Sequence, residues 1–90
     1  MHDRTVKVVN ALGLHARAAA QLVRLASTFR CSIRIKRDDT GIEADAKSIL
    51  NVLHIGASKG VELRIITDGE GEAEALAAIE HLFITGFGEM

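Results

Sequence analysis

The chain has 90 residues, of which 48% are hydrophobic and 26% are charged, with a formal net charge of -1 and a mean hydropathy of +0.17. A chain of this length buries roughly 60 to 65% of its unfolded surface, so we expect a single domain over residues 1–90 whose chemistry lies near the surface. The longest uncharged run, Ser48–Ser58, has eleven residues, and because a membrane-spanning helix needs about 20 apolar residues, no transmembrane segment is expected.

The first half of the chain predicts a strand and then a helix. Residues Thr5–Val9 alternate between polar and apolar side chains, which is typical of a strand. Residues 10–14 interrupt this pattern. From Ala16 to Phe29 polar side chains recur at spacings of four, three and four residues, which predicts a helix with one solvated face. The residues on that face are Arg17, Gln21, Arg24 and Thr28.

A β-hairpin and a short helix are predicted next. The alternating segments 32–36 and 42–45 flank a polar turn, as in a hairpin. Residues Lys47–Leu53 begin with a residue of the capping type and continue with apolar side chains, so they predict a helix that ends near Gly56.

The last two elements complete a mixed α and β pattern. Val61–Ile65 alternates as a strand, and the following helix starts after residue 71, is acidic in its first turn as the helix dipole favours, and stops near Gly86. The order of elements is therefore βαββαβα. Half-polar strands and amphipathic helices in this order predict an α+β fold, a two-layer open-faced sandwich whose helices cover one face of an antiparallel sheet.

The near-neutral net charge hides an uneven distribution. Residues 1–37 carry eight Lys or Arg and one acid, for a charge of +7, whereas residues 38–90 carry three bases and eleven acids, for a charge of -8. One interpretation is a basic surface that prefers acidic partners. The alternative is that the two halves interleave in the fold, so that their charges mix.

Composition also limits the location and the class of partner. The first seven residues carry charges where a signal peptide needs an apolar core, which predicts a cytoplasmic protein. Cys31 is the only cysteine, so neither an internal disulfide nor a thiolate metal cluster can form. The chain contains three Phe and no Trp or Tyr, so it lacks the stacking platforms of single-stranded nucleic-acid binders. No nucleic-acid partner and no membrane insertion are therefore expected.

His15 is the histidine with the most informative position. A glycine-containing loop delivers it to the start of the first predicted helix, two residues before Arg17. A helix N-terminus presents unpaired N–H groups that favour a phosphoryl group and disfavour imidazolium, which leaves a neutral ring with a lone pair free to attack. Arg17 adds a cation for the phosphate oxygens. This pattern predicts a histidine that accepts phosphate, and the alternative is a polar helix cap.

Ser48 is a second candidate, at the start of the short helix and ahead of an apolar run. Phosphorylation of Ser48 would add negative charge at a helix N-terminus and alter any partner that docks on the apolar side chains beside it. A plain N-cap is the alternative. Lys47 is most simply a solvated charge.

A complete catalytic apparatus is not expected. His2, His54 and His81 have no His or Cys companion at metal-ligand spacing, so we expect no metal site. The sequence has no Gly-rich nucleotide loop, and therefore no cofactor is expected. If His15 has a chemical role, the protein is a carrier rather than a stand-alone enzyme.

Three successive motifs resemble the HPr family, the histidine-containing phosphocarriers of the bacterial phosphoenolpyruvate-dependent phosphotransferase system. The motifs are Gly13–Ala20, Ala46–Leu50 and Gly56–Gly60. The resemblance covers essentially the whole chain. It implies a four-stranded antiparallel sheet in the order 1-4-2-3 with three helices on one face, in agreement with the order of elements predicted above.

The resemblance also implies roles for single residues. His15 would accept a phosphoryl group on Nδ1 from phosphorylated Enzyme I and pass it to an EIIA-type domain, with Arg17 as the neighbouring cation. Ser48 matches a regulatory serine that HPr kinase/phosphorylase phosphorylates in many members. We expect partners to meet an apolar patch and two further basic residues. These are Ile49, Leu50, Leu53, Arg24 and Lys47.

One departure from the family pattern is Ala18, because the family commonly has proline at this position. Alanine should loosen the first helical turn by roughly 0.4 to 1 kcal/mol and slow the transfer without preventing it. The departure also fits the alternative of a regulatory paralogue, either of the nitrogen type or controlled through Ser48, which acts on other proteins instead of on sugar transport. A monomer is expected in either case.

Overall fold

The computed structural model describes residues 1–89, so that Met90, the last residue of the expected domain, lies outside the described part. The strands are β1 (His2–Lys7), β2 (Ser32–Arg37), β3 (Ile42–Asp45) and β4 (Glu62–Asp68). The helices are α1 (Ala16–Ala26), α2 (Ile49–His54) and α3 (Glu72–Ile84), and a short 3-10 turn, η1 (Gly86–Gly88), follows α3. The predicted βαββαβα order is therefore confirmed.

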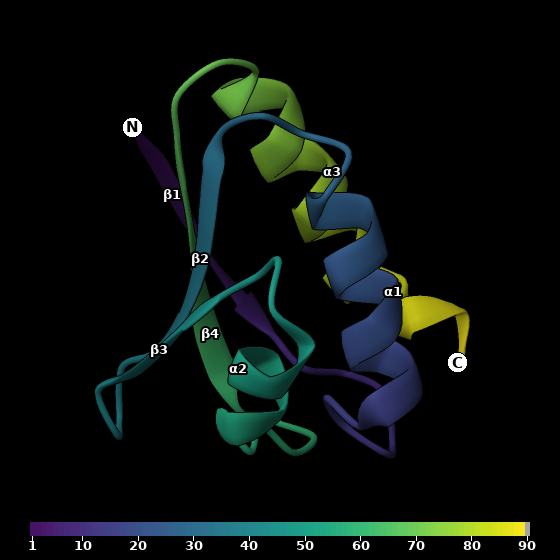
Figure 1. The fold of residues 1–90 in the computed structure, drawn as a ribbon. Coiled ribbons are helices and arrows are strands. Elements are labelled where there is room, and N and C mark those ends of the chain that lie inside the picture. The colour runs from purple at the N-terminus through teal and green to yellow at the C-terminus, as the bar shows by residue number, and fades with distance from the viewer. Residues whose placement is uncertain (90) are drawn as a thin grey trace.

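The four strands form one antiparallel sheet in the order β1-β4-β2-β3. Figure 1 shows the three helices together on one side of this sheet, with the other face open. The predicted open-faced sandwich and its strand order are thus confirmed. Because β4 lies between β1 and β2, the last strand of the chain joins the first β-strand to the hairpin.

The core lies between the sheet and the helices. Alternate residues of β2 and β4 point inward and are at most 1% exposed, as the strand period of two requires. They are Ile33, Ile35, Leu63, Ile65 and Thr67. Leu22 of α1 with Ile79 and Phe83 of α3 covers them from the helical layer, each of these side chains being at most 1% exposed. The helices are therefore fixed against the sheet by their apolar faces.

Several element boundaries differ from the predicted ones. β1 begins at His2 rather than Thr5 and ends at Lys7 rather than Val9, because its pairing with β4 runs from His2 opposite Thr67 to Lys7 opposite Glu62. The last strand extends to Asp68 because β2 pairs with it that far. An edge strand takes its ends from its hydrogen-bonding neighbour, which local alternation does not reveal.

The first helix is shorter than predicted, ending at Ala26 rather than Phe29. The hydroxyls of Ser27 and Thr28 donate to the carbonyls of Val23 and Leu25, both at 2.7 Å. Ser and Thr side chains that bond to nearby carbonyls compete with the backbone and favour helix ends. Thr28, which was predicted to lie on the solvated face of this helix, therefore helps to end the helix instead.

The uneven charge along the chain is largely mixed by the strand order. Arg34 pairs with Glu43 at 2.6 Å, Arg64 with Asp38 at 3.1 Å, and Arg4 with Glu80 at 2.9 Å. Each pair joins the basic first part of the chain to the acidic second part or lies within the acidic part. Arg17 and Arg24, both exposed on α1, form no ion pair with any residue between 1 and 89. The interleaving interpretation therefore holds for the sheet, and α1 keeps unpaired cations.

Candidate functional site

The loop before α1 is held by a close backbone approach at Gly13. Gly13 has φ +66°, and a Cβ on it would lie 2.6 Å from the carbonyl oxygen of Ala57. The next residue, Leu14, donates its N–H to that same oxygen at 2.9 Å. Only glycine tolerates both the left-handed backbone and this contact. The loop therefore places His15 at the N-cap of α1, as the sequence predicted.

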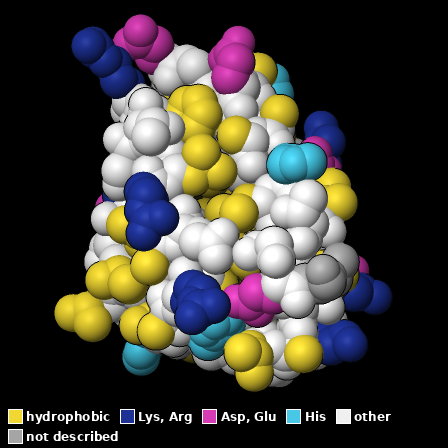
Figure 2. All heavy atoms as spheres, turned by 90° about the vertical axis from the view of Figure 1, so that its right-hand side faces the viewer, with side chains coloured by type: hydrophobic (Ala, Val, Ile, Leu, Met, Phe, Trp, Pro, Cys, Tyr) yellow, Lys and Arg dark blue, Asp and Glu magenta, His cyan; other side chains and the backbone are white. Residues whose placement is uncertain are grey.

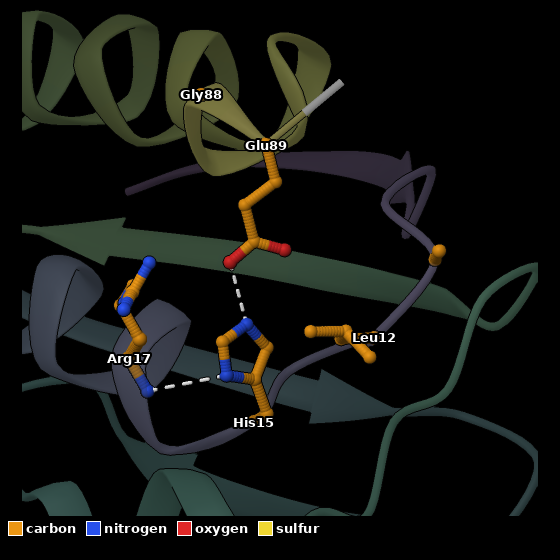
Figure 3. A pocket seen from close by; sticks show the side chains of 6 residues that line it. Leu12, His15, Arg17, Gly88 and Glu89 are labelled. Carbon is orange, nitrogen blue, oxygen red and sulfur yellow. Dashed lines mark hydrogen bonds and ion pairs between the residues drawn. The ribbon is translucent and has the colours of Figure 1, made fainter.

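The two ring nitrogens of His15 face different partners (Figure 3). Nδ1 accepts a hydrogen bond from the backbone N–H of Arg17 at 3.3 Å, and Nε2 lies 2.5 Å from Oε2 of Glu89. An amide N–H can only donate, and an ionised carboxylate can only accept. The geometry therefore places the ring proton on Nε2 and leaves the Nδ1 lone pair directed at the N-terminal end of α1.

Glu89 is itself held by a buried side chain. The Nδ2 of Asn10, which is 1% exposed, donates to Glu89 Oε1 at 3.0 Å and to the carbonyl of Gly13 at 2.8 Å. Hydrogen bonds from Asn10 and from His15, in that order of strength, hold the pKa of Glu89 below its usual value. The carboxylate is therefore ionised at neutral pH and available as an acceptor for the His15 ring.

An open pocket of about 750 Å³ lies beside the ring. It is lined by Ala11, Leu12, His15, Arg17, Gly88 and Glu89. Figure 2 shows the helical side of the molecule, on which basic, acidic and histidine side chains lie beside exposed hydrophobic ones. The pocket thus lies beside the imidazole of His15, the first turn of α1, whose N–H groups have few acceptors within the helix, and the Arg17 guanidinium. Such a set can bind a tetrahedral anion and attack it.

Ser48 occupies the predicted N-cap position of α2 with an extended backbone, but its hydroxyl makes no capping hydrogen bond. α2 packs against α1, so the apolar patch predicted beside Ser48 lies on the element next to the helix that carries His15 (Figure 1). The exposed fractions of the patch residues are 39% for Ile49, 76% for Leu50 and 37% for Leu53. The structure therefore leaves these large side chains open to a partner.

Lys47 differs from its predicted state. Its Nζ donates to the backbone carbonyl of Phe29 at 2.7 Å, and the side chain is partly buried. The interpretation as a solvated charge is therefore wrong. Lys47 lies between β3 and α2, and its hydrogen bond connects this segment to the residues that follow α1. Arg24 remains exposed on the same helix as Arg17, two turns further along.

Sequence reasoning missed three residues at this site. Asn10 lay in a segment that merely interrupted a strand pattern, and Glu89 lay beyond the expected helix stop at Gly86. Gln21, assigned to the solvated face of α1, donates to the carbonyl of Phe87 at 3.2 Å. In the sequence, the signal for a turn in this segment was the pair of glycines, Gly86 and Gly88, on either side of Phe87.

Residues 1–89 contain neither a cluster of potential metal ligands nor a helix suited to span a membrane. No three His, Cys, Asp or Glu side chains in this range lie close enough to hold a metal ion. Within the same range no helix has both the length and the apolar character needed to cross a bilayer.

Comparison with known proteins adds an independent line of evidence. A family model described as "PTS HPr component phosphorylation site" matches residues 2–85. The phosphocarrier protein HPr of Treponema pallidum is 44% identical over 86 residues, covering 96% of each chain. The phosphocarrier protein NPr of Escherichia coli is 40% identical over 86 residues, covering 96% of this chain and 94% of its own. A crystal structure of HPr from Thermoanaerobacter tengcongensis superposes with a TM-score of 0.94 at 36% identity, covering 100% of this chain and 99% of that one.

Proposed function

The chain belongs to the HPr family of phosphocarriers of the phosphotransferase system, and we propose that it accepts a phosphoryl group on His15 Nδ1 from phosphorylated Enzyme I and passes it to an EIIA-type domain. The observation that carries this proposal is the hydrogen bonding of the ring. Nδ1 is an acceptor at the N-terminus of α1, and the opposite nitrogen carries the proton. The nucleophilic atom therefore faces the N–H groups that can hold the phosphate oxygens.

The proposed transfer needs no atom from outside the two proteins. The Nδ1 lone pair attacks phosphorus, the bond from phosphorus to the donor atom breaks, and its electron pair stays with the donor. The second transfer reverses these steps toward the acceptor domain. Arg17 and the first-turn N–H groups stabilise the charge on the equatorial oxygens in both directions. The protein acts as a carrier, with neither a cofactor nor a metal in the reaction.

Partners dock on the surface around His15. The exposed cations Arg17 and Arg24 face acidic sites on Enzyme I and on the EIIA-type domain, with Lys47 at the edge of this surface. The apolar part of the interface is formed by Ile49, Leu50 and Leu53, whose exposure supports this role. The protein does this as a monomeric single domain over residues 1–90 in the cytoplasm, and in its general form it links Enzyme I to sugar transport.

A second candidate function is regulatory. The similarity to the E. coli protein named NPr, at 40% identity, is close to that to the named HPr proteins, which favours considering a nitrogen-type acceptor as well as a sugar-type one. Ser48 has a hydroxyl free of capping contacts, which leaves it available to HPr kinase/phosphorylase. In this second candidate the same phosphorylation at His15 ends on a domain that controls other proteins.

The test is intact mass spectrometry after incubation with Enzyme I, magnesium and phosphoenolpyruvate. We expect one phosphoryl group that acid removes and that is absent in His15→Ala. His81→Ala is the matched control, because His81 is also exposed on a helix and should leave the modification intact. Phosphorylation that persists in His15→Ala, or an unmodified wild-type protein, would show that the proposed carrier function is wrong.

A second experiment separates the two candidate functions. The phosphorylated protein is mixed in turn with a sugar-type and a nitrogen-type EIIA domain, and the rate of phosphoryl loss is compared. Faster transfer to the nitrogen-type domain supports the regulatory function, and faster transfer to the sugar-type domain supports the transport function. Incubation of wild type and Ser48→Ala with HPr kinase and ATP then tests whether Ser48 accepts an acid-stable phosphate.

A further inference from the structure

The turn after α3 is built from unusual backbone conformations. Gly86, Phe87 and Gly88 have φ values of +61°, +57° and +74°. Phe87 adopts a region that non-glycine residues avoid, and it does so with a side chain that is 3% exposed and packs edge-to-face on Phe83 at 5.0 Å between ring centroids. The buried ring therefore holds the strained turn in place.

The same turn is also fastened to α1. Gln21 donates its side-chain N–H to the carbonyl of Phe87 at 3.2 Å. This contact, together with the buried ring, holds the turn against the helix whose first residues form the candidate site. The chain leaves the turn at Glu89, whose side chain reaches back over the His15 ring (Figure 3).

We propose that Glu89 is a positioning residue for His15: its carboxylate keeps the ring proton on Nε2, reserves Nδ1 for the phosphoryl group, and stabilises the cationic ring that forms after transfer. This proposal rests on the proposed function of His15. Glu89 touches neither the phosphoryl group nor the attacking nitrogen, and it acts only through the far side of the ring.

Both carboxylate oxygens of Glu89 are engaged, which makes the orientation specific. Oε1 accepts from the buried Asn10 at 3.0 Å, and Oε2 meets His15 Nε2 at 2.5 Å. The side chains of His15 and Glu89 are only 27% and 19% exposed, so solvent screens this pair less than a surface ion pair. A carboxylate that accepts from one imidazole nitrogen selects the tautomer in which the other nitrogen has the lone pair.

The charges that face the ring are few. Arg17 approaches from α1 and Glu89 from the turn after α3, whereas the loop contributes the uncharged Ala11 and Leu12. The N-terminus of α1 and the Arg17 guanidinium disfavour a positive ring. Glu89 opposes them from the Nε2 side, and so it is the one acidic group in this pocket lining that can stabilise a cationic imidazole.

The transfer step shows why a proton held on Nε2 matters. When Nδ1 forms its bond to phosphorus, the donor bond breaks and its electrons leave with the donor, so the ring keeps the Nε2 proton and becomes cationic. In the second transfer, the bond from Nδ1 to phosphorus breaks and its electrons return to the cationic ring, which leaves as a neutral imidazole. Loss of the Nε2 proton before that step would leave a ring that departs as an anion, which is a poorer leaving group. Glu89 therefore keeps the phosphorylated ring ready to donate.

The first test uses the unphosphorylated protein and is independent of Enzyme I. Nitrogen-15 NMR of the His15 ring, in alkaline buffer where the imidazole is neutral, reports which nitrogen carries the proton. In wild type we expect Nε2–H to dominate. In Glu89→Ala we expect the ratio of the Nδ1–H to the Nε2–H form to rise roughly two- to fivefold. Glu89→Gln keeps an acceptor and should lie between them, and Glu74→Gln, an exposed acid on α3, should match wild type.

The second test measures hydrolysis of the phosphorylated protein against pH. Cationic phosphoimidazole hydrolyses faster, so in Glu89→Ala and Glu89→Gln the decline of the rate should shift to lower pH by about half a unit or more, while Glu74→Gln follows wild type. An unchanged tautomer ratio or an unchanged profile in Glu89→Ala would overturn the inference. If Enzyme I leaves wild type unmodified, the proposed function fails, and the NMR result still decides whether Glu89 positions the ring.

Discussion

Two residues of opposite hydrogen-bonding character control the His15 ring. The N–H of Arg17 donates to Nδ1 at 3.3 Å, and Glu89 meets Nε2 at 2.5 Å. Asn10 supports this arrangement from beneath, and its Oδ1 is buried without a hydrogen-bond partner among the described residues. A buried polar atom without a partner costs free energy, roughly 1 to 3 kcal/mol. Asn10 therefore contributes to the site through its Nδ2 donor, which orients the carboxylate of Glu89.

Replacement of Arg17 tests the role of the guanidinium. We expect Arg17→Gln to lower kcat/KM for transfer from Enzyme I by about ten- to a hundredfold, because one charge-assisted hydrogen bond contributes roughly 1.5 to 3 kcal/mol. The variant should stay folded, since surface substitutions usually change stability by less than about 0.5 kcal/mol. Rapid-quench kinetics measures the rate.

Arg24→Gln is the control for charge alone, because Arg24 is exposed on the same helix and two turns from Arg17. It should weaken association with acidic partners in a salt-dependent way and leave the rate in the complex unchanged. Equal losses of the bound-state rate in both variants would contradict the assignment of Arg17 to the phosphate oxygens.

At the scale of single elements, the first turn of α1 contains Ala18, whose side chain packs in the core and whose backbone N–H lies among those that lack an acceptor within the helix. Ala18 is fully buried in the third helical position, and the N–H groups of a first turn have no acceptor within the helix. Proline fits the backbone of such a turn, and its ring restricts the unfolded chain.

We expect Ala18→Pro to raise the free energy of unfolding by about 0.4 to 1 kcal/mol, read from urea denaturation. Ala26→Pro, in the last turn of the same helix, should instead cost roughly 3 kcal/mol, because it removes a backbone hydrogen bond. A loss of stability in Ala18→Pro would mean that the buried packing around this position has no room for the ring.

The loop that carries His15 depends on Gly13. We expect Gly13→Ala to lower the free energy of unfolding by at least about 2 kcal/mol, because strain at positive φ is added to a Cβ contact of 2.6 Å with the backbone of Ala57. It should also slow phosphorylation, since the displaced loop moves His15 away from the α1 N-terminus.

Gly41→Ala is the matched control for this loop. Gly41 has φ +78° but nothing within 4 Å of an added Cβ, so only the backbone strain of about 1 to 2 kcal/mol remains. Chemical denaturation of both variants measures the difference. Equal destabilisation would show that the close approach at Ala57 contributes nothing.

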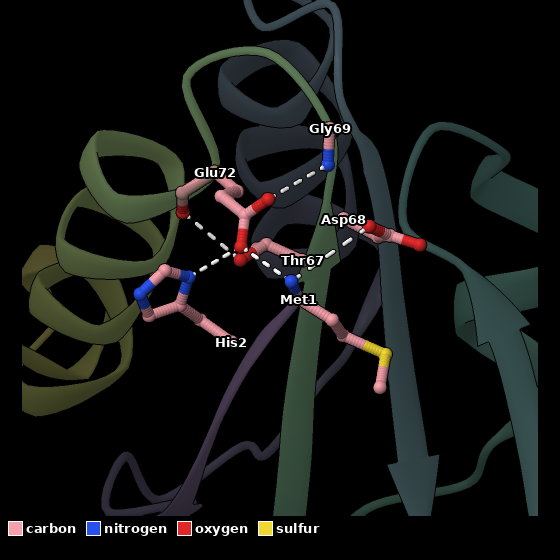
Figure 4. Close-up of polar contacts among 6 residues, drawn as sticks. All are labelled: Met1, His2, Thr67, Asp68, Gly69 and Glu72. Carbon is pink, nitrogen blue, oxygen red and sulfur yellow. Dashed lines mark hydrogen bonds and ion pairs between the residues drawn. The ribbon is translucent and has the colours of Figure 1, made fainter.

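At the scale of the whole molecule, an ionic cluster connects the start of β1 to the end of β4 and the start of α3 (Figure 4). Glu72, at the start of α3, accepts from the Met1 amino group at 2.8 Å and from the N–H of Gly69 at 3.1 Å, and it also pairs with His2. Hydrogen bonds from Met1, Gly69 and His2, in that order, lower the pKa of Glu72 from its ordinary 4.5 to about 2. The cluster joins the first strand to the last helix.

This shift predicts a pH dependence of stability. A carboxyl whose pKa is depressed in the folded state stabilises the fold above its unfolded pKa and loses that contribution as the pH falls. For Glu72 the loss should occur between about pH 4.5 and pH 2. We therefore expect Glu72→Gln to have a lower Tm than wild type at neutral pH, with the difference vanishing near pH 2. Glu70→Gln, an exposed neighbour, should follow wild type at every pH, and a constant difference for Glu72→Gln would contradict the assignment.

The elements and the candidate nucleophile were predictable because their signals are local. Side chains of β2 and β4 alternate between core and solvent with a period of two, and α1 buries its apolar face, so hydropathy alone indicates both. The position of His15 at a helix start depends only on the residues on either side of it. The ends of β1 and α1 were less accurate, because a neighbouring strand and the hydroxyls of Ser27 and Thr28 decide them.

By itself the sequence determined the order of strands and helices, the side of each that is buried, and the placement of His15 and Arg17 at one helix N-terminus. Only the tertiary structure decided what surrounds the ring. Glu89 meets His15 across 74 residues of chain and meets Asn10 across 79, while Lys47 reaches Phe29 across 18. Such contacts leave no periodic trace in the sequence, since each depends on how the sheet, α3 and the turn after it pack together.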